Sequence, residues 1–98
     1  PAYYFLLTEV LRAAGVQLGL SAETAARLAR QTFIGAARMA EGDTDVGELR
    51  ARVTSKGGTT EAAVQYLEAA GLRRIFADAL AAAARRGAEL GDQLDAKA

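Results

Sequence analysis

Apolar residues recur along this chain at intervals of three and four positions, the spacing that indicates amphipathic helices. No stretch shows the one-in-two alternation of a half-buried strand, and the strong helix formers Ala, Leu, Arg and Glu occur throughout. Glycines and small polar clusters interrupt the pattern four times. The sequence therefore predicts an all-α domain of five helices.

Helix boundaries follow from the capping and breaking residues. The first predicted helix covers residues 2–19, and the second follows a Ser21 cap and stops at Gly42. A third, short helix is predicted around residues 48–53, after the possible caps Asp43, Thr44 and Asp45. The fourth begins near Thr59 and ends before Gly71, and the fifth covers residues 72–94, with residues 95–98 expected to fray.

The first two helices have distinct apolar faces. In the first, Glu9 and Arg12 mark the polar side and the apolar face consists of Tyr3, Leu7, Val10, Leu11, Ala14 and Leu18. Gly15 costs about 1 kcal/mol relative to alanine, which predicts close approach of another backbone. In the second, the inward positions are Ala25, Ala29, Phe33, Ala36 and Ala40. Ile34 lies on the polar face of that helix and hints at a second contact surface.

The fifth helix carries two adjacent apolar stripes. One consists of Phe76, Leu80, Ala83, Gly87, Leu90 and Leu94, and the other of the small residues Ala77, Ala81, Ala84, Ala88 and Gly91. Together they are wider than the face a surface helix usually buries, so we expect contacts on more than one side. Four shorter helices offer too few large side chains to cover both stripes, which predicts a second copy of the chain. The alternative is one compact bundle with an alanine-rich core.

Composition narrows the chemistry. Of the 98 residues 51% are hydrophobic, but 24 are alanine, so one small domain with a thin core is expected. The 12 basic and 12 acidic residues balance, so the chain has no net electrostatic field that would attract nucleic acid or an anionic membrane. Histidine and cysteine are absent, which removes the usual metal ligands and nucleophilic dyads. We expect a cytoplasmic chain without a membrane span, cut from a longer protein just before Pro1.

Residues 53–61, with the sequence VTSKGGTTE, form the one segment suited to binding chemistry. The segment combines four hydroxyl side chains and two glycines with the start of a helix, where unpaired N–H groups attract a carboxylate or phosphate. The structural alternative is a glycine turn in which Thr59 caps the helix and Glu61 complements the helix dipole. The segment fits neither a Walker loop nor a dinucleotide fingerprint.

This segment resembles the signature of pyrroline-5-carboxylate reductase. The similarity extends over nearly the whole chain in the same order, through 1–3 (PAY), 14–16 (AGV), 18–20 (LGL), 31–32 (QT), 35–37 (GAA), 47–50 (GELR), 53–60 and 71–73 (GLR). The resemblance implies a C-terminal helical domain like that of this family and of 6-phosphogluconate dehydrogenase, intertwined as a homodimer or built into a larger oligomer. It also implies reduction of 1-pyrroline-5-carboxylate to L-proline by NADPH or NADH, held by an N-terminal Rossmann domain that this chain lacks.

The resemblance assigns the substrate carboxylate to Ser55, Gly58, Thr59 and Thr60, and Thr60 is the candidate catalytic residue that orients the imine. Lys56 departs from the proline usual in the family, which leaves its role open. Tyr3, Tyr4 and Phe5 are more simply interpreted as core or dimer contacts than as part of a cofactor wall. The alternative functional class is a non-catalytic helical association module. A helix-turn-helix nucleic-acid binder fits poorly, because its recognition helix would present alanines and balanced charge.

Overall fold

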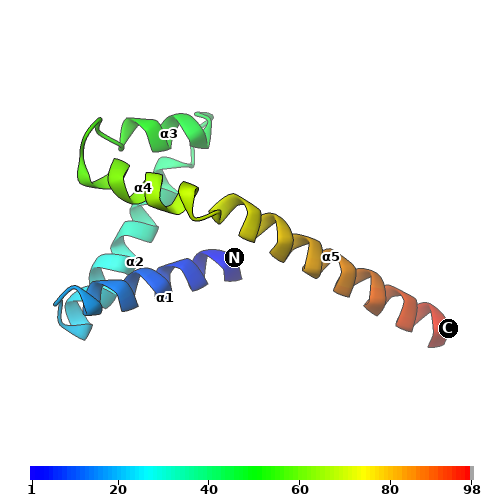
Figure 1. Cartoon of the computed structure of the whole chain (residues 1–98). Helices are drawn as coiled ribbons and strands as arrows, with labels where there is room; N and C mark the ends of the chain where they lie inside the picture. The colour runs from blue at the N-terminus through cyan, green and yellow to red at the C-terminus, as the bar shows by residue number, and fades with distance from the viewer. Residues whose placement is uncertain (98) are drawn as a thin grey trace. The chain divides into compact units, whose positions relative to one another are not determined.

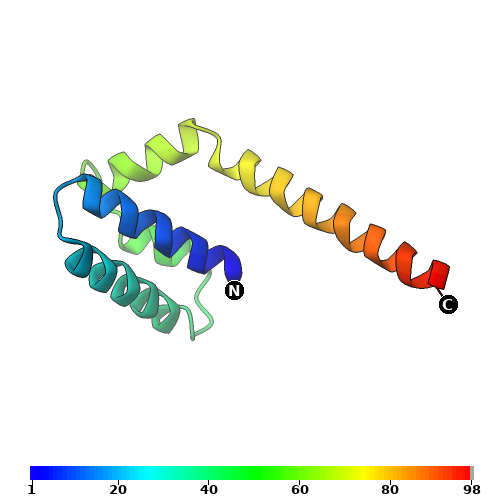
Figure 2. The same ribbon diagram turned by 90° about the horizontal axis from the view of Figure 1, so that it is seen from below.

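The computed structural model describes residues 1–97, and these form five α-helices joined by short turns (Figures 1 and 2). The helices are α1 (Ala2–Gln17), α2 (Ala22–Met39), α3 (Val46–Arg52), α4 (Thr59–Ala69) and α5 (Leu72–Lys97). The predicted fold class and the order of the five helices are confirmed.

Several predicted boundaries are wrong by a few residues. α1 ends two residues before the predicted end, α2 ends at Met39 rather than at Gly42, and α3 begins at Val46. α5 continues to Lys97, so the expected fraying of residues 95–97 is contradicted, while Ala98 lies outside the described residues. The uninterrupted run of helix formers explains the longer α5, since no glycine or proline follows Gly91.

The chain divides into two compact units, Pro1–Arg52 and Val53–Ala98. In the first unit, α1 and α2 form an antiparallel hairpin. The Ser21 hydroxyl oxygen accepts a hydrogen bond from the Thr24 N–H at 3.1 Å, which confirms the predicted cap. A Cβ added to Gly15 would lie 3.3 Å from the Ala25 Cβ, so Gly15 permits the close helix contact that its position predicted.

Aromatic rings join the other end of the same hairpin. Phe33 of α2 stacks with Tyr4 at a centroid distance of 6.4 Å and meets Phe5 edge-on at 5.6 Å. These rings contact each other within the hairpin, but Tyr3, Tyr4 and Phe5 are exposed, so their role as core or dimer contacts stays a prediction. The α2 positions Ala25 and Ala29 are buried, whereas the other predicted inward alanines, Ala36 and Ala40, are exposed.

The apolar face that the sequence predicts for the first helix is not the face of α1 that meets α2. Phe5 and Gly15 contact α2, and Thr8 and Arg12 line the groove between the helices. The expected stripe is instead exposed, from Tyr3 (49%) to Leu18 (87%). Helical periodicity correctly identified an apolar surface, but α1 has two such surfaces and uses the other one for its own hairpin.

The short helix α3 begins at an aspartate cap. The Asp45 Oδ2 accepts a hydrogen bond from the Gly47 N–H at 2.9 Å, and Arg52 forms an exposed ion pair with Glu48 at 2.9 Å.

In the second unit, α4 and α5 meet at Gly71, which has a φ of +91° that disfavours other residues. Arg73 Nε also bridges to Glu68 at 2.9 Å across this turn, and α5 then extends away from α4 (Figures 1 and 2).

Burial in the described chain is slight. Only Ala25 and Ala29 are buried, at 2% and 8% exposure, and 21 of the 26 large apolar side chains are exposed. On α5 the exposed residues include Leu80, Leu90 and Leu94. Within residues 1–97, no helix combines the length and apolar character needed to cross a membrane. The apolar faces predicted from the sequence therefore exist but lack the cover that their width requires.

Candidate functional site

The segment before α4 folds as a tight turn. The Gly58 N–H donates to the Ser55 carbonyl at 3.0 Å, and Gly57, the third residue of the turn, has a φ of +75°. This combination is typical of a type II turn, which requires a left-handed third residue and therefore favours glycine. The sequence thus places Gly57 where a side chain would be strained, and the chain enters α4 directly after the turn.

Glu61 holds the turn against the helix. Its Oε1 accepts a hydrogen bond from the Gly57 N–H at 3.1 Å. The N-cap is Gly58, in an extended conformation with a φ of −90° and no side-chain cap, so the alternative in which Thr59 caps α4 is wrong. Thr59 is instead the first residue of the helix, so its hydroxyl group does not cap α4.

The predicted substrate-binding residues lie together at this helix entrance. The turn brings Ser55 back to Gly58, and Thr59 and Thr60 form the first turn of α4. The side chains of Ser55, Thr59 and Thr60 are exposed, and no hydrogen bond to their hydroxyl groups occurs among the described residues. Because the first amides of a helix have no intrahelical acceptor, the entrance offers hydroxyl and N–H donors to a small anion.

Positions 56 and 58 both bear on the backbone conformation of this turn. A Cβ on Gly58 would lie 3.2 Å from the Ser55 carbonyl oxygen and 3.4 Å from the Ser55 Cβ, a tight fit in the turn. Lys56 occupies the second position of the type II turn, where proline is favoured because its fixed φ matches the turn. The turn therefore explains why a proline would suit position 56, although this chain has an exposed lysine there.

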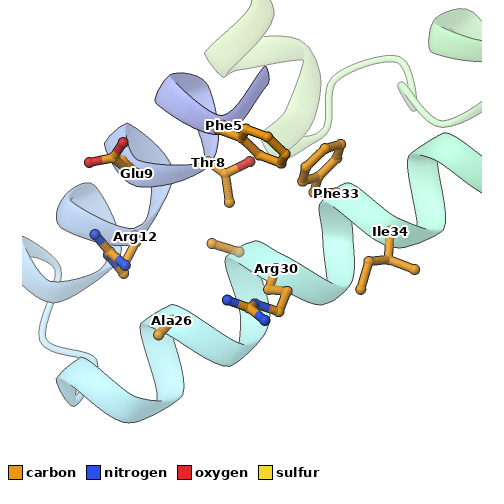
Figure 3. Close-up of a pocket in the computed structure, with 9 residues that line it drawn as sticks. Phe5, Thr8, Glu9, Arg12, Ala26, Arg30, Phe33 and Ile34 are labelled. Carbon is orange, nitrogen blue, oxygen red and sulfur yellow. The ribbon is translucent and has the colours of Figure 1, made fainter. Parts of the chain in front are cut away.

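A second feature, missed by the sequence analysis, is a groove between α1 and α2 (Figure 3). Its volume is about 420 Å³. The lining residues are Phe5, Thr8, Glu9, Arg12, Ala26, Ala29, Arg30, Phe33 and Ile34. Glu9 and Arg12 were expected on the polar side of the first helix, yet both line this groove. The apolar Ile34 on the polar face of the second helix was the one signal of it.

The described residues hold no group of three acidic side chains placed to bind a metal ion. Among residues 1–96 the charged side chains are exposed except Glu61, which is half-buried, and the ion pairs lie at the surface, including Arg74 with Asp78 and Arg86 with Glu89. Such pairs contribute little to stability. The polar entrance of α4 and the uncovered apolar faces are therefore the features that carry functional information.

Wide apolar faces that the chain itself leaves uncovered are typical of the class of helical association domains. The sequence profile of a family described as "Pyrroline-5-carboxylate reductase dimerisation" matches residues 1–90. The chain belongs to this pyrroline-5-carboxylate reductase dimerisation family.

Curated relatives agree with the family assignment. A pyrroline-5-carboxylate reductase of Pseudomonas aeruginosa is 52% identical over 95 residues, which cover 96% of this chain and 35% of the relative. That of Pisum sativum is 46% identical over 91 residues, covering 92% of this chain and 33% of the relative. The chain thus spans about a third of the length of the curated relatives that it matches.

Solved structures agree with the fold. The structure of a pyrroline-5-carboxylate reductase from Coxiella burnetii superposes with a TM-score of 0.85 at 54% identity, covering 92% of this chain and 34% of that one. A Plasmodium falciparum pyrroline carboxylate reductase, solved with NADP bound, gives a TM-score of 0.77 at 35% identity over 84% of this chain and 33% of the other. The all-helical architecture is therefore that of the family.

Proposed function

We propose that this chain is the dimerisation and substrate-binding part of a reductase that converts 1-pyrroline-5-carboxylate to L-proline. The open entrance of α4 supports this function most directly. It gathers Ser55, Gly58, Thr59 and Thr60 around exposed donors, and the relatives named after this substrate match the chain almost throughout.

The carboxylate of the substrate would sit at the N-terminal end of α4. There the N–H groups of Thr59 and Thr60 carry the positive end of the helix dipole, and the hydroxyl groups of Ser55 and Thr59 add hydrogen-bond donors. Hydrogen bonds to a charged acceptor are stronger than neutral ones, so this set of donors holds the substrate without a basic side chain. Gly57 and Gly58 supply the turn that exposes these groups.

Thr60 is the candidate for orienting the ring. With the carboxylate fixed, its hydroxyl group would hydrogen-bond the imine nitrogen and align the C=N bond for reduction. This contribution is positioning and electrostatic stabilisation rather than covalent catalysis. The dinucleotide NADPH or NADH, when bound, would supply the hydride that is transferred to the imine carbon, and a proton from solvent would complete the amine nitrogen.

A Rossmann domain outside this chain would hold that dinucleotide. The described residues form helices and turns without a strand, so a nucleotide-binding sheet would have to come from elsewhere in the protein. We further infer that two chains pair through their uncovered helical faces, as a homodimer or a larger ring, in the cytoplasm. The chain would then combine assembly with one half of each active site.

Substitution of Thr60 in a full-length reductase containing this chain tests the proposal. We expect Thr60→Ala to lower kcat/KM for 1-pyrroline-5-carboxylate about 100-fold, since a hydrogen bond to the reacting group is lost. Thr60→Ser keeps the hydroxyl group and should retain activity within about threefold. Steady-state kinetics and circular dichroism of both variants make the comparison.

The companion control is Gln65→Ala, later in α4, which should leave kcat/KM unchanged. Equal activities of Thr60→Ala and the parent enzyme would remove Thr60 from the site. If the parent protein itself reduced no imine but still dimerised, the alternative of a non-catalytic association module would replace the enzyme assignment.

A further inference from the structure

Glu61 is placed differently from every other charged side chain in residues 1–96. It is half-buried, whereas the others are exposed. It is the third residue of α4, and its Oε1 accepts a hydrogen bond from the Gly57 N–H at 3.1 Å. This hydrogen bond, which we term the Glu61 brace, joins the first turn of α4 to the turn at residues 55–58.

The Glu61 brace is not an ordinary helix cap. A glutamate at the third position of a helix usually accepts a hydrogen bond from the N–H of the capping residue. In this chain the N–H of the cap, Gly58, donates to the Ser55 carbonyl at 3.0 Å, and Glu61 reaches one residue further back. The brace therefore acts on the turn, and it does not occupy the N–H groups of Thr59 and Thr60.

The Gly57 N–H belongs to the central peptide group of the type II turn. A peptide group is planar, so its N–H and the Lys56 carbonyl point in opposite directions. Type I and type II turns differ mainly in the orientation of this group, and its reversal takes the φ of the third residue from about +80° to about −90°. Gly57 has a φ of +75°. An acceptor that α4 holds on the N–H side therefore favours the observed orientation over the reversed one.

That orientation matters for the donors at the helix entrance. Ser55 lies before the central peptide group, and Thr59 and Thr60 lie after it. Reversal of the group would move the Ser55 hydroxyl group relative to the first N–H groups of α4. The donors can converge on one carboxylate only while the turn keeps one conformation.

We propose that Glu61 is a positioning residue for the substrate carboxylate. It does not touch the substrate, and it acts by holding the Gly57 peptide group in the orientation that brings Ser55 beside the first residues of α4. The inference rests on the proposed function and adds a residue to it. A role limited to complementing the helix dipole would need only the negative charge of Glu61, whereas positioning needs its oxygen acceptor.

Two imine substrates test this role in the full-length reductase. 1-Pyrroline has the same ring as 1-pyrroline-5-carboxylate but lacks the carboxylate. We expect Glu61→Ala to lower kcat/KM for the carboxylate substrate about fivefold, through KM with kcat unchanged, and to change kcat/KM for 1-pyrroline less than about twofold. Glu61→Gln keeps the acceptor and should lower neither value. Gln65→Ala, at an exposed position later in α4, is the control for a loss of side-chain atoms.

A double variant tests the route of the effect. If Glu61 acts through the Gly57 peptide group, Gly57→Ala with Glu61→Ala should lower kcat/KM about tenfold, as expected for Gly57→Ala alone, rather than about fiftyfold, the product of two independent effects. The larger loss would overturn the inference, as would equal losses of kcat/KM for both imines. The double variant decides alone if the parent reduces 1-pyrroline too slowly to measure. A parent enzyme that reduces neither imine would instead contradict the proposed function.

Discussion

The turn at residues 53–61 and the helix α5 differ in what each leaves unpaired. The turn is held by the hydrogen bond from the Gly58 N–H to the Ser55 carbonyl and by the one from the Gly57 N–H to Glu61. Its hydroxyl groups and the first N–H groups of α4 remain available as hydrogen-bond donors. α5 satisfies its backbone internally and leaves apolar side chains open, including Leu80 and Leu90 at 50% and 45% exposure. A small ligand can complete the turn, whereas only another large surface can complete the helix. Substitutions in each region should separate the effect of the exposed apolar face of α5 from that of the polar donors of the turn, and the largest effect is expected on α5.

The apolar face of α5 should respond most strongly to substitution. Leu80→Asp combined with Leu90→Asp is expected to raise the dimer Kd at least about 1,000-fold, since each leucine contributes about 2 kcal/mol when buried. Light scattering coupled to size-exclusion chromatography detects the resulting monomer. Gln93→Asp adds one negative charge to α5 outside both stripes and should remain dimeric. If the double variant also remained dimeric, α5 would not be an association face.

The turn should respond to a single methyl group at Gly57. With a φ of +75°, Gly57→Ala introduces about 1–2 kcal/mol of strain, so we expect KM for the substrate to rise about tenfold in the full-length enzyme. Gly35→Ala is the matched control, because Gly35 lies inside α2 and a Cβ there meets no atom within 4 Å. That change should stabilise the protein by about 0.5–1 kcal/mol without altering KM. An unaltered KM for Gly57→Ala would show that the turn does not position substrate.

Two substitutions at Glu61 separate its brace from its charge. Glu61→Ala removes the acceptor for the Gly57 N–H and should raise KM about fivefold, since a lost hydrogen bond of this kind costs about 1 kcal/mol. Glu61→Gln keeps an oxygen acceptor and removes a negative charge beside the proposed carboxylate site, so KM should fall about two- to threefold. Steady-state kinetics at low ionic strength resolves the difference. A rise in KM for both variants would argue against an anion at this entrance.

The smallest expected effect is at Lys56. Lys56→Pro should stabilise the protein by about 0.4–1 kcal/mol, because proline restricts the unfolded chain and its φ suits the second position of the turn. The thermal midpoint should rise by a few degrees while dimer Kd stays constant. Lys56→Ala is the control for loss of the charge alone. A lower midpoint for the proline variant would contradict the type II turn.

The same contrast explains which features could be predicted from the sequence. Helix order, the Ser21 cap, the close approach at Gly15 and the turn glycines depend on neighbouring residues, and these predictions are confirmed. The sequence did not indicate which face of α1 meets α2, because Phe5 and Leu7 mark two apolar surfaces that periodicity cannot rank. For the same reason the groove around Arg12 was missed. The roles of Ser55, Gly58, Thr59 and Thr60 stay predictions that rest on family resemblance.

The slight burial described above has a consequence for how the protein survives in a cell. Because two alanines are the only buried residues in the described part of the chain, contacts made on assembly would supply a large part of the folding free energy. The melting temperature should then climb with protein concentration, and dilution should act as a denaturant. Newly made chains would have to associate before proteases degrade them, so the concentration of chains would itself affect how much of the protein persists.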